Sequence, residues 1–304
     1  MRWRSKTQPV DAEIARLREA VAGPVMARHP GSHHIVVANP KGGTGKTTVA
    51  ALLGLNLAEH RGEVAAIVDA NPHTGTLRRR LVPPTQPAPL PLVDLARAIL
   101  GGEASPEWPF LARYTDLVGR LRVLTNQDAD PARVEETTGE EYRSIVALLS
   151  RAAQIVISDM GTSSTGPVAV AALETAQSLV VATELTQDSL ELTIEMVSAL
   201  AGQPKSYRPD PDDWSAVSNG RFLPLVASAV VAISPGRDDR DPVDLDGLLA
   251  WLRAVCRGGV ILIPRDRQLA SGDLLIPSAL APATRAAHLT VAAAVATRFP
   301  VAGA

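Results

Sequence analysis

The chain has 304 residues, of which 46% are hydrophobic and 20% are charged, and its formal net charge is −2. This length and composition are typical of a globular protein with one large α/β domain or two small ones. The nearly neutral charge argues against bulk attraction to nucleic acid, and a single cysteine, Cys256, excludes an internal disulfide and a cysteine-cluster metal site. No apolar run of about 18 residues could span a membrane, and the basic start lacks the apolar core of a signal peptide, so we expect a cytoplasmic protein.

Residues 1–32 are predicted to form an N-terminal extension that contains a short amphipathic helix over 11–21, ended by Gly23 and Pro24. We expect this helix to dock on the surface of its own domain. The alternative is an arm that binds a partner or a membrane surface, because basic residues and a tryptophan precede the helix. The helix is indicated by apolar residues spaced three and four apart, namely Val10, Ile14, Leu17 and Val21.

A glycine-rich loop follows the short apolar run 35–38, which is typical of a buried parallel strand. From Lys46 onward, closely spaced apolar residues predict a buried helix. The order of strand, glycine loop and helix suits phosphate, because successive backbone N–H groups and the positive helix N-terminus point at the anion. Lys46 would contact the β- and γ-phosphates, and the Thr47 hydroxyl would bind Mg²⁺.

The strict P-loop pattern requires a glycine five residues before Gly45, and Pro40 stands there instead. The sequence Lys-Gly-Gly-Thr-Gly-Lys-Thr-Thr over 41–48 resembles the deviant Walker A box of the ParA/MinD ATPase family. A chance glycine turn is disfavoured by the flanking strand and helix. The resemblance implies that Lys41 reaches across a dimer interface to the partner's nucleotide. It also implies that ATP is bound by the whole box, that is by Lys41, Gly42, Gly43, Thr44, Gly45, Lys46, Thr47 and Thr48.

A second predicted strand, Val64 to Val68, ends in Asp69-Ala70-Asn71-Pro72. An acid at the carboxyl end of a parallel strand lies in the crevice where ligands bind. The segment resembles the family's switch I, which implies that Asp69 holds Mg²⁺ through water. Asn71 replaces the acid that positions and activates the attacking water. An amide orients water but is a poor general base, so we expect hydrolysis to be slow.

Between residues 77 and 152 the sequence predicts a helical turn at 77–81, a proline-rich surface crossing at 82–91 and an irregular stretch at 106–116. The turn carries Arg78, Arg79 and Arg80. We interpret them as a solvated turn, and the alternative is a basic patch near the nucleotide. Further elements are predicted as a helix at 92–100, a strand at 121–124 and a helix at 140–152.

A later strand, 155–158, ends in Asp159. A strand-terminal aspartate fits a Walker B site that holds Mg²⁺ through water, and the small residues of 160–164 resemble the family's switch II. Pro264, Arg265 and Asp266 follow a predicted strand at 260–263. They resemble the family's adenine pocket, in which the proline packs on the ring and the backbone or Asp266 reads its edge. The asparagine that reads adenine in many relatives corresponds here to Ser234, which puts that contact in doubt.

The remaining elements are predicted as a strand at 179–182, a helix at 186–200, an acidic insertion at 203–221, a strand within 222–233 and helices at 248–255 and from Pro282. Strands that alternate with helices predict an α/β fold with a doubly wound, mostly parallel sheet and helices on both faces. Residues 33–304 are expected to form a single P-loop ATPase domain. The closing helix lacks a basic amphipathic tail, so we expect no membrane anchor.

The resemblance covers residues 33–299 and extends to the actinobacterial MinD-like subgroup associated with type VII (ESX) secretion. It implies that ATP and Mg²⁺ drive a homodimer that forms through the nucleotide face and positions a cargo or partner protein. A first alternative is an ATP-bound scaffold with little turnover, which Asn71 suggests. A second is a DNA-partitioning ATPase that binds nonspecific DNA, which the net charge disfavours.

Overall fold

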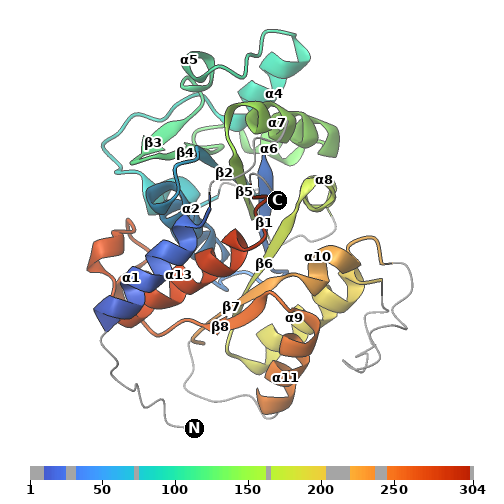
Figure 1. Ribbon diagram of the computed structural model, residues 1–304. Coiled ribbons are helices and arrows are strands. Elements are labelled where there is room, and N and C mark those ends of the chain that lie inside the picture. The colour runs from blue at the N-terminus through green and yellow to red at the C-terminus, as the bar shows by residue number, and fades with distance from the viewer. Residues whose placement is uncertain are drawn as a thin grey trace.

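The computed structural model describes residues 10–24, 32–71, 75–161, 166–202, 220–236 and 245–301. Within them, eight strands form one sheet in the order β3-β4-β2-β5-β1-β6-β7-β8, with helices on both faces (Figure 1). All neighbouring strands are parallel except the antiparallel pair β3–β4. The predicted doubly wound, mostly parallel α/β fold is confirmed. The strands are β1 His33–Ala38, β2 Ala65–Ala70, β3 Asp116–Val118, β4 Leu121–Leu124, β5 Ile155–Met160, β6 Ser178–Glu184, β7 Val230–Ser234 and β8 Gly259–Leu262.

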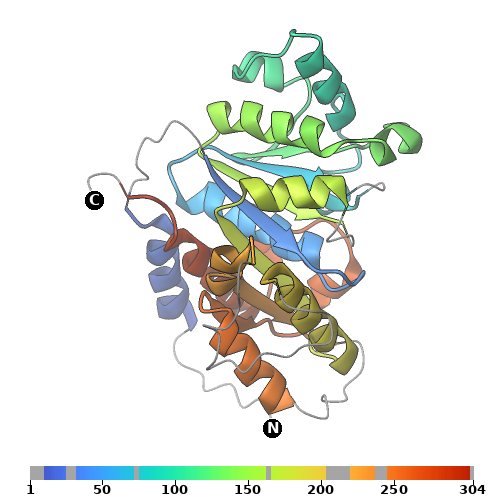
Figure 2. The same ribbon diagram turned by 90° about the vertical axis from the view of Figure 1, so that its right-hand side faces the viewer.

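Along the described chain, helices separate successive strands except where β4 follows β3 directly, and they lie on both sides of the sheet (Figure 2). They are α1 Val10–Ala22, α2 Lys46–His60, α3 Leu77–Leu81, α4 Leu92–Leu100, α5 Trp108–Leu111, α6 Pro131–Glu135, α7 Gly139–Ala152, α8 Pro167–Thr175, α9 Gln187–Leu200, α10 Leu223–Ala227, α11 Leu245–Val255, α12 Arg267–Ser271 and α13 Pro282–Ala296, with a 3-10 turn at Pro277–Ala279. No described helix is both long enough and apolar enough to cross a membrane.

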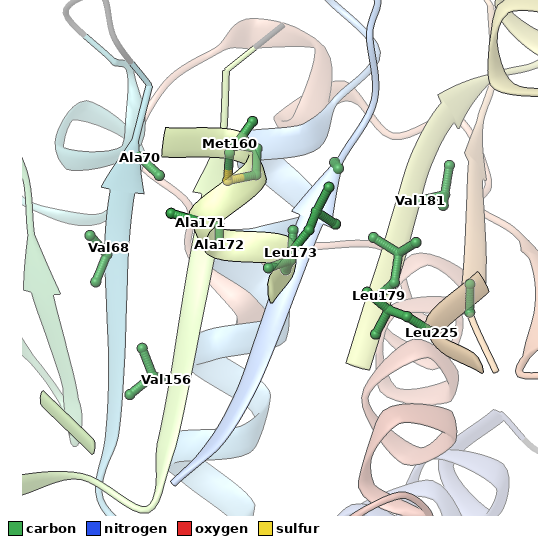
Figure 3. Close-up of a cluster of buried hydrophobic side chains, with 14 of the residues drawn as sticks. Val68, Ala70, Val156, Met160, Ala171, Ala172, Leu173, Leu179, Val181 and Leu225 are labelled. Atoms are coloured by element: carbon green, nitrogen blue, oxygen red, sulfur yellow. The ribbon is translucent and has the colours of Figure 1, made fainter. Parts of the chain in front are cut away.

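The central strands are buried on both faces, so each contributes side chains alternately to two apolar clusters. Ile35, Ile67 and Ile157 are aligned across β1, β2 and β5 and pack beneath α2. Val68 and Val156 point to the opposite face and pack with residues of α8 and β6 (Figure 3). Burial of each isoleucine contributes about 1.5–3 kcal/mol to the free energy of unfolding. Apolar packing on both faces of the sheet therefore fixes the positions of the strand ends.

Helix α1 lies beside α13 (Figure 1) and also contacts α2. Its residues Ile14, Leu17 and Val21 are buried in the same cluster as the apolar face of α2. Arg61, just after α2, donates hydrogen bonds to the carbonyl oxygens of Val21 and Pro24. The predicted helix is therefore present and docks on this face, whereas the basic residues that precede it lie outside the described residues. The division into an extension, 1–32, and an ATPase domain, 33–304, remains a proposal.

The structure corrects two expectations near α3. The stretch 106–116 was expected to be irregular, but it contains α5 and leads into β3, which pairs antiparallel with β4. The arginine turn was expected to be solvated, but only Arg79 is exposed. The Arg78 guanidinium donates to the buried Asp116 carboxylate at 2.8 Å, so it joins α3 to β3. Periodicity misses these features because β3 is short and the acidic partner lies far away in sequence.

Candidate nucleotide-binding site

The site is assembled at the carboxyl edge of the sheet, where three central strands end together. The strand register pairs Val37 of β1 with Asp159 of β5, and Asp159 with Asp69 of β2. The two acids therefore lie side by side, next to the strand that leads into the glycine loop. This edge is where open α/β sheets bind their ligands. Residues predicted from three separate segments are thus brought to one place.

The loop over 41–45 has the backbone that an anion requires. Gly43 and Gly45 have φ values of 81° and 83°, in the left-handed region that favours glycine. Gly45 is also the N-cap residue of α2, and no side chain caps that helix end. Because the first N–H groups of a helix have no partner within the helix, they remain available to an anion.

Lys46 is the first residue of α2 and directly follows the glycine loop. Its side chain is buried, and its Nζ donates a hydrogen bond to the carbonyl oxygen of Lys41 at 2.7 Å. Burial lowers the pKa of Lys46, and the nearby charge of Asp159 opposes that effect. A buried ammonium held by a neutral carbonyl gains energy when a phosphate oxygen becomes its acceptor. The geometry therefore fits the predicted contact with the β- and γ-phosphates.

Asp69 and Asp159 are both buried, and their environment disfavours two negative charges. Burial raises the pKa of Asp159 to about 7, although the Thr47 hydroxyl and Lys46 act to lower it. Burial, followed by the charge of Asp159, raises the pKa of Asp69 well above its ordinary value. Within the described chain, Asp159 Oδ1 is buried and accepts no hydrogen bond. A hard divalent cation would restore both charges, so this oxygen-rich set, with Thr47 beside it, fits Mg²⁺.

Lys41 lies against its own chain. Its Nζ donates to Ser189 Oγ at 2.9 Å, in the first turn of α9, whose N-cap is Thr186. The Lys41 backbone N–H donates to Asn39 Oδ1, and the Asn39 amide donates to Thr193 Oγ1. This polar network joins the loop to α9. Sequence reasoning missed Asn39, Ser189 and Thr193, because hydroxyls spaced along a helix carry no distinctive signal.

Asn71 follows β2 directly, and its backbone N–H donates to Asp69 Oδ1 at 3.2 Å. The backbone N–H of Leu77 also bonds Asp69. Gly75 lies so close that an added Cβ would be 1.8 Å from Asp69 Oδ2, so only glycine fits there without a shift. No sequence motif distinguishes Gly75. Pro72, the last residue of the switch I resemblance, lies outside the described residues, as do residues 162–165.

The segment 264–266 follows β8 at the same edge, beside Ser234 at the end of β7. Asp266 caps α12: its Oδ1 accepts from the Gln268 N–H at 2.9 Å and its Oδ2 from the Ala281 N–H at 2.8 Å. Burial would raise the pKa of Asp266, but these main-chain N–H groups outweigh it and lower the pKa. Both carboxylate oxygens are therefore occupied, which leaves the backbone as the better candidate to read adenine. Pro264 stays a predicted contact of the ring.

Arg265, the middle residue of the segment, donates to the Gly236 carbonyl oxygen at 2.8 Å and so joins the loop after β8 to the loop after β7. The strand pairing of Ile233 with Leu262 brings these two loops together. An added Cβ on Gly45 would be 3.3 Å from Ser234 Oγ, so the end of β7 also borders the glycine loop. The predicted adenine segment and the predicted phosphate loop are therefore neighbours.

Comparison with known proteins matches this arrangement to a family. A family model described as the CobQ/CobB/MinD/ParA nucleotide binding domain matches residues 35–250, which include the glycine loop, Asp69 and Asp159. The chain belongs to this family. The resemblance read from the deviant Walker A box is therefore confirmed.

Solved ParA/MinD structures share the fold. The ParA family ATPase from Chlorobium tepidum TLS aligns with a TM-score of 0.63 and 17% identity, over 87% of this chain and 98% of that one. The septum site-determining protein MinD from Pyrococcus horikoshii OT3, complexed with Mg-ADP, aligns with a TM-score of 0.58 and 18% identity, over 86% of this chain and 94% of that one. At these identities the likeness shows the fold alone.

One relative by sequence is the ESX-1 secretion-associated protein EspI of Mycobacterium tuberculosis. It is 27% identical over 280 residues, which cover 91% of this ParA/MinD-family chain and 38% of the relative. The chain therefore spans less than half the length of this relative. The match agrees with the ESX-associated subgroup that the motifs resemble.

Proposed function

We propose that this ParA/MinD-family protein binds Mg-ATP in the loop over 41–48, hydrolyses it slowly and uses the nucleotide state to control a homodimer. The observation that carries the proposal is the combination of Lys41 with an uncapped phosphate loop and a buried acid pair. A nucleotide site alone would need Lys46, Thr47 and the acids, but not Lys41. The second lysine is the feature that points to a sandwiched dimer.

Each residue of the site then has one role. Lys46 and the loop N–H groups bind the phosphates, while Thr47, Asp69 and Asp159 are the residues that would hold Mg²⁺, the acids through water. When bound, Mg²⁺ supplies charge neutralisation to the phosphates and to the buried acid pair. Asn71 orients the attacking water but accepts its proton poorly, which makes turnover slow. Lys41 leaves Ser189 and contacts the nucleotide of the partner subunit.

The partner or cargo is a protein whose binding depends on the dimer. The sequence relative is named as ESX-1 secretion-associated, and we propose that this chain serves a type VII secretion machine in the same way. Nonspecific DNA is a less suitable cargo, because two of the three residues of the arginine turn are buried and bonded within the protein.

The deciding experiment is the solution mass from light scattering in Mg-ATP and in Mg-ADP, followed over an hour. We expect a dimer in ATP and a monomer in ADP. Lys41→Ala should abolish the ATP dimer while it still binds nucleotide, and Lys41→Arg is the charge-retaining control. The same mass in both nucleotides, or an unimpaired Lys41→Ala dimer, would contradict the proposed switch.

The scaffold alternative is favoured by one residue, Asn71, which replaces the water-activating acid. In that case ATP is bound as a structural ligand and turnover is negligible. Asn71→Asp should then raise the rate of phosphate release well above that of the wild type. Ordinary wild-type turnover that Asn71→Asp leaves unchanged would dispose of the scaffold.

The DNA-partitioning alternative makes a different prediction. Binding through phosphate contacts weakens steeply with salt, so it would be strongest at low ionic strength. A gel-shift assay at low salt with and without ATP tests it, and the absence of ATP-dependent retardation would eliminate it.

A further inference from the structure

Arg80, at the end of α3, joins the helix of the phosphate loop to a segment near the other end of the chain. Its guanidinium is buried, with 4% of the residue exposed. One nitrogen, Nη2, donates to Thr48 Oγ1 at 2.9 Å, and the other, Nη1, donates to the Asp273 carbonyl oxygen at 2.9 Å. The backbone takes part as well, because the Leu275 N–H donates to the Arg80 carbonyl oxygen at 2.8 Å.

The same short helix is attached at its other end to the acid of the second strand. The Leu77 N–H, at the start of α3, bonds Asp69, and the Leu77 side chain is fully buried. Helix α3 is thus bonded to Asp69 at its first residue, Leu77, and through Arg80, near its other end, to Thr48 in the first turn of α2. These contacts connect Asp69, which is proposed to hold the metal, with Thr48, which belongs to the proposed phosphate loop.

The hydrogen bond from Arg80 determines what the Thr48 hydroxyl can do. A threonine hydroxyl has one hydrogen to donate and two lone pairs to accept with. Arg80 occupies the acceptor side, and none of the described residues accepts the hydroxyl hydrogen. That hydrogen is therefore available to an anion at the loop. A hydroxyl that accepts from a cation is also polarised into a stronger donor.

The charge of Arg80 points the same way. Its carbonyl and hydroxyl acceptors are neutral, and the Asp273 carboxylate acts on it only through space. A buried cation is costly unless an anion is near. A triphosphate in the adjacent loop would supply that anion.

We propose that Arg80 is a positioning residue for the nucleotide: it holds the Thr48 hydroxyl as a donor to a phosphate oxygen. Through its bonds to Leu269 and Asp273, it also couples the phosphate loop to α12 and to the segment that follows this helix. This inference rests on the proposed function, because it requires a nucleotide phosphate at the loop.

A double-mutant cycle on the full chain tests the assignment, with Mg-ATP affinity measured by titration calorimetry. The variants are Arg80→Met, Thr48→Val and the double variant, and Arg79→Met is the matched control that removes an exposed arginine next in sequence. We expect Arg80→Met and Thr48→Val each to weaken binding about tenfold, because each removes a charge-assisted hydrogen bond or the donor that it orients. The double variant should bind about as weakly as Thr48→Val alone, and Arg79→Met like the wild type.

Two results would overturn the assignment. Unchanged affinity in Arg80→Met would show that Arg80 has no part in binding, and independent losses that multiply in the double variant would show that it does not act through Thr48. A purely structural role predicts a lower melting temperature in all Arg80 variants with unchanged affinity well below it. If Arg80→Met does not fold, Arg80→Lys replaces it, and Thr48→Ser should restore the affinity that Thr48→Val loses. Failure of the wild type to bind Mg-ATP would instead refute the proposed function.

Discussion

Gly75 shows how one atom can decide whether Asp69, a predicted magnesium-binding acid, is correctly placed. Its Cα lies against the Asp69 carboxylate, and a Cβ there would be 1.8 Å from Oδ2. A contact this short forces either the acid or the chain to move, because real Cβ atoms stay beyond about 3 Å. Glycine is therefore required here by the closeness of the Asp69 carboxylate and not by the backbone of a turn. A glycine of this kind cannot be recognised from a glycine-rich motif.

We predict that Gly75→Ala weakens Mg-ATP binding by at least tenfold and costs about 1–3 kcal/mol of unfolding free energy, as overpacking usually does. Calorimetry and urea denaturation measure the two effects. Gly62→Ala is the control, since a Cβ at Gly62 meets nothing within 4 Å. Wild-type affinity in Gly75→Ala would mean that Asp69 does not need its present position.

The acid pair makes stability depend on pH. The pKa of Asp159 is raised to about 7 from 3.8, so the folded protein keeps a proton that the unfolded chain loses above about pH 4. Stability supplied by this group is present at low pH and is lost as the pH rises toward 7. His33 and His34 act in the opposite direction, because burial lowers the pKa of each to about 4. The stability that these neutral histidines supply is lost as the pH falls from about 6.5 toward 4, because the unfolded chain then binds protons that the folded protein does not.

The carboxylate effect is isolated by comparison of the wild type with Asp159→Asn. We predict that the wild type loses up to a few kcal/mol of stability relative to Asp159→Asn between pH 4 and pH 7. Added Mg²⁺ at pH 8 should raise the melting temperature of the wild type and leave Asp159→Asn almost unchanged. Parallel pH profiles with no selective effect of Mg²⁺ would contradict the picture of a cation site.

At the scale of elements, α9 holds the Lys41 side chain through a hydrogen bond to Ser189. The Lys41 ammonium donates to the Ser189 hydroxyl, and the Ser189 carbonyl oxygen accepts a hydrogen bond from the Thr193 hydroxyl at 2.7 Å. In the proposed dimer, Lys41 would first have to break its bond to Ser189 before it could reach the other subunit. The helix would then set part of the free-energy cost of dimerisation.

We predict that Ser189→Ala favours the ATP dimer about fivefold, which corresponds to the loss of one hydrogen bond of about 1 kcal/mol in the monomer. Sedimentation equilibrium in Mg-ATP measures the dissociation constant. The control is Ser198→Ala on the same helix, because Ser198 is fully buried and its hydroxyl has no hydrogen-bond partner among the described residues. A weaker dimer in Ser189→Ala would mean that Ser189 supports the interface instead.

At the scale of the whole molecule, α1 closes one face of the fold. It packs on α13 and α2, and its apolar residues belong to the cluster that lies under the phosphate-loop helix. The candidate nucleotide site lies at the sheet edge, whereas α1 covers the outside of these helices. Stability and nucleotide binding should therefore separate at this helix.

We predict that Leu17→Ala lowers the free energy of unfolding by about 2–4 kcal/mol while Mg-ATP affinity changes less than twofold. Urea denaturation and calorimetry provide the two measurements. Arg16→Ala on the exposed side of α1 is the control, because its surface ion pair with Glu13 contributes little. A loss below about 0.5 kcal/mol in Leu17→Ala would show that α1 is not docked in solution.

The sequence alone determined most of the longer strands and helices, the predicted phosphate loop and the acids at two strand ends, because these features depend on short-range patterns. Lys41, Lys46, Thr47, Asp69 and Asp159 could all be named from a local motif or from the end of an apolar run. The family assignment also followed from one local stretch.

Only the tertiary structure decided which distant side chains meet. The strand register places Asp69 beside Asp159. Arg78 donates a hydrogen bond to Asp116, and Arg80 donates one to Thr48. The Asp266 carboxylate caps α12. A buried arginine and a solvated arginine look identical in sequence, because the difference is whether an acceptor from a remote segment is present. Pairings of this kind are created by the sheet order and the packing of both faces, which no local pattern records.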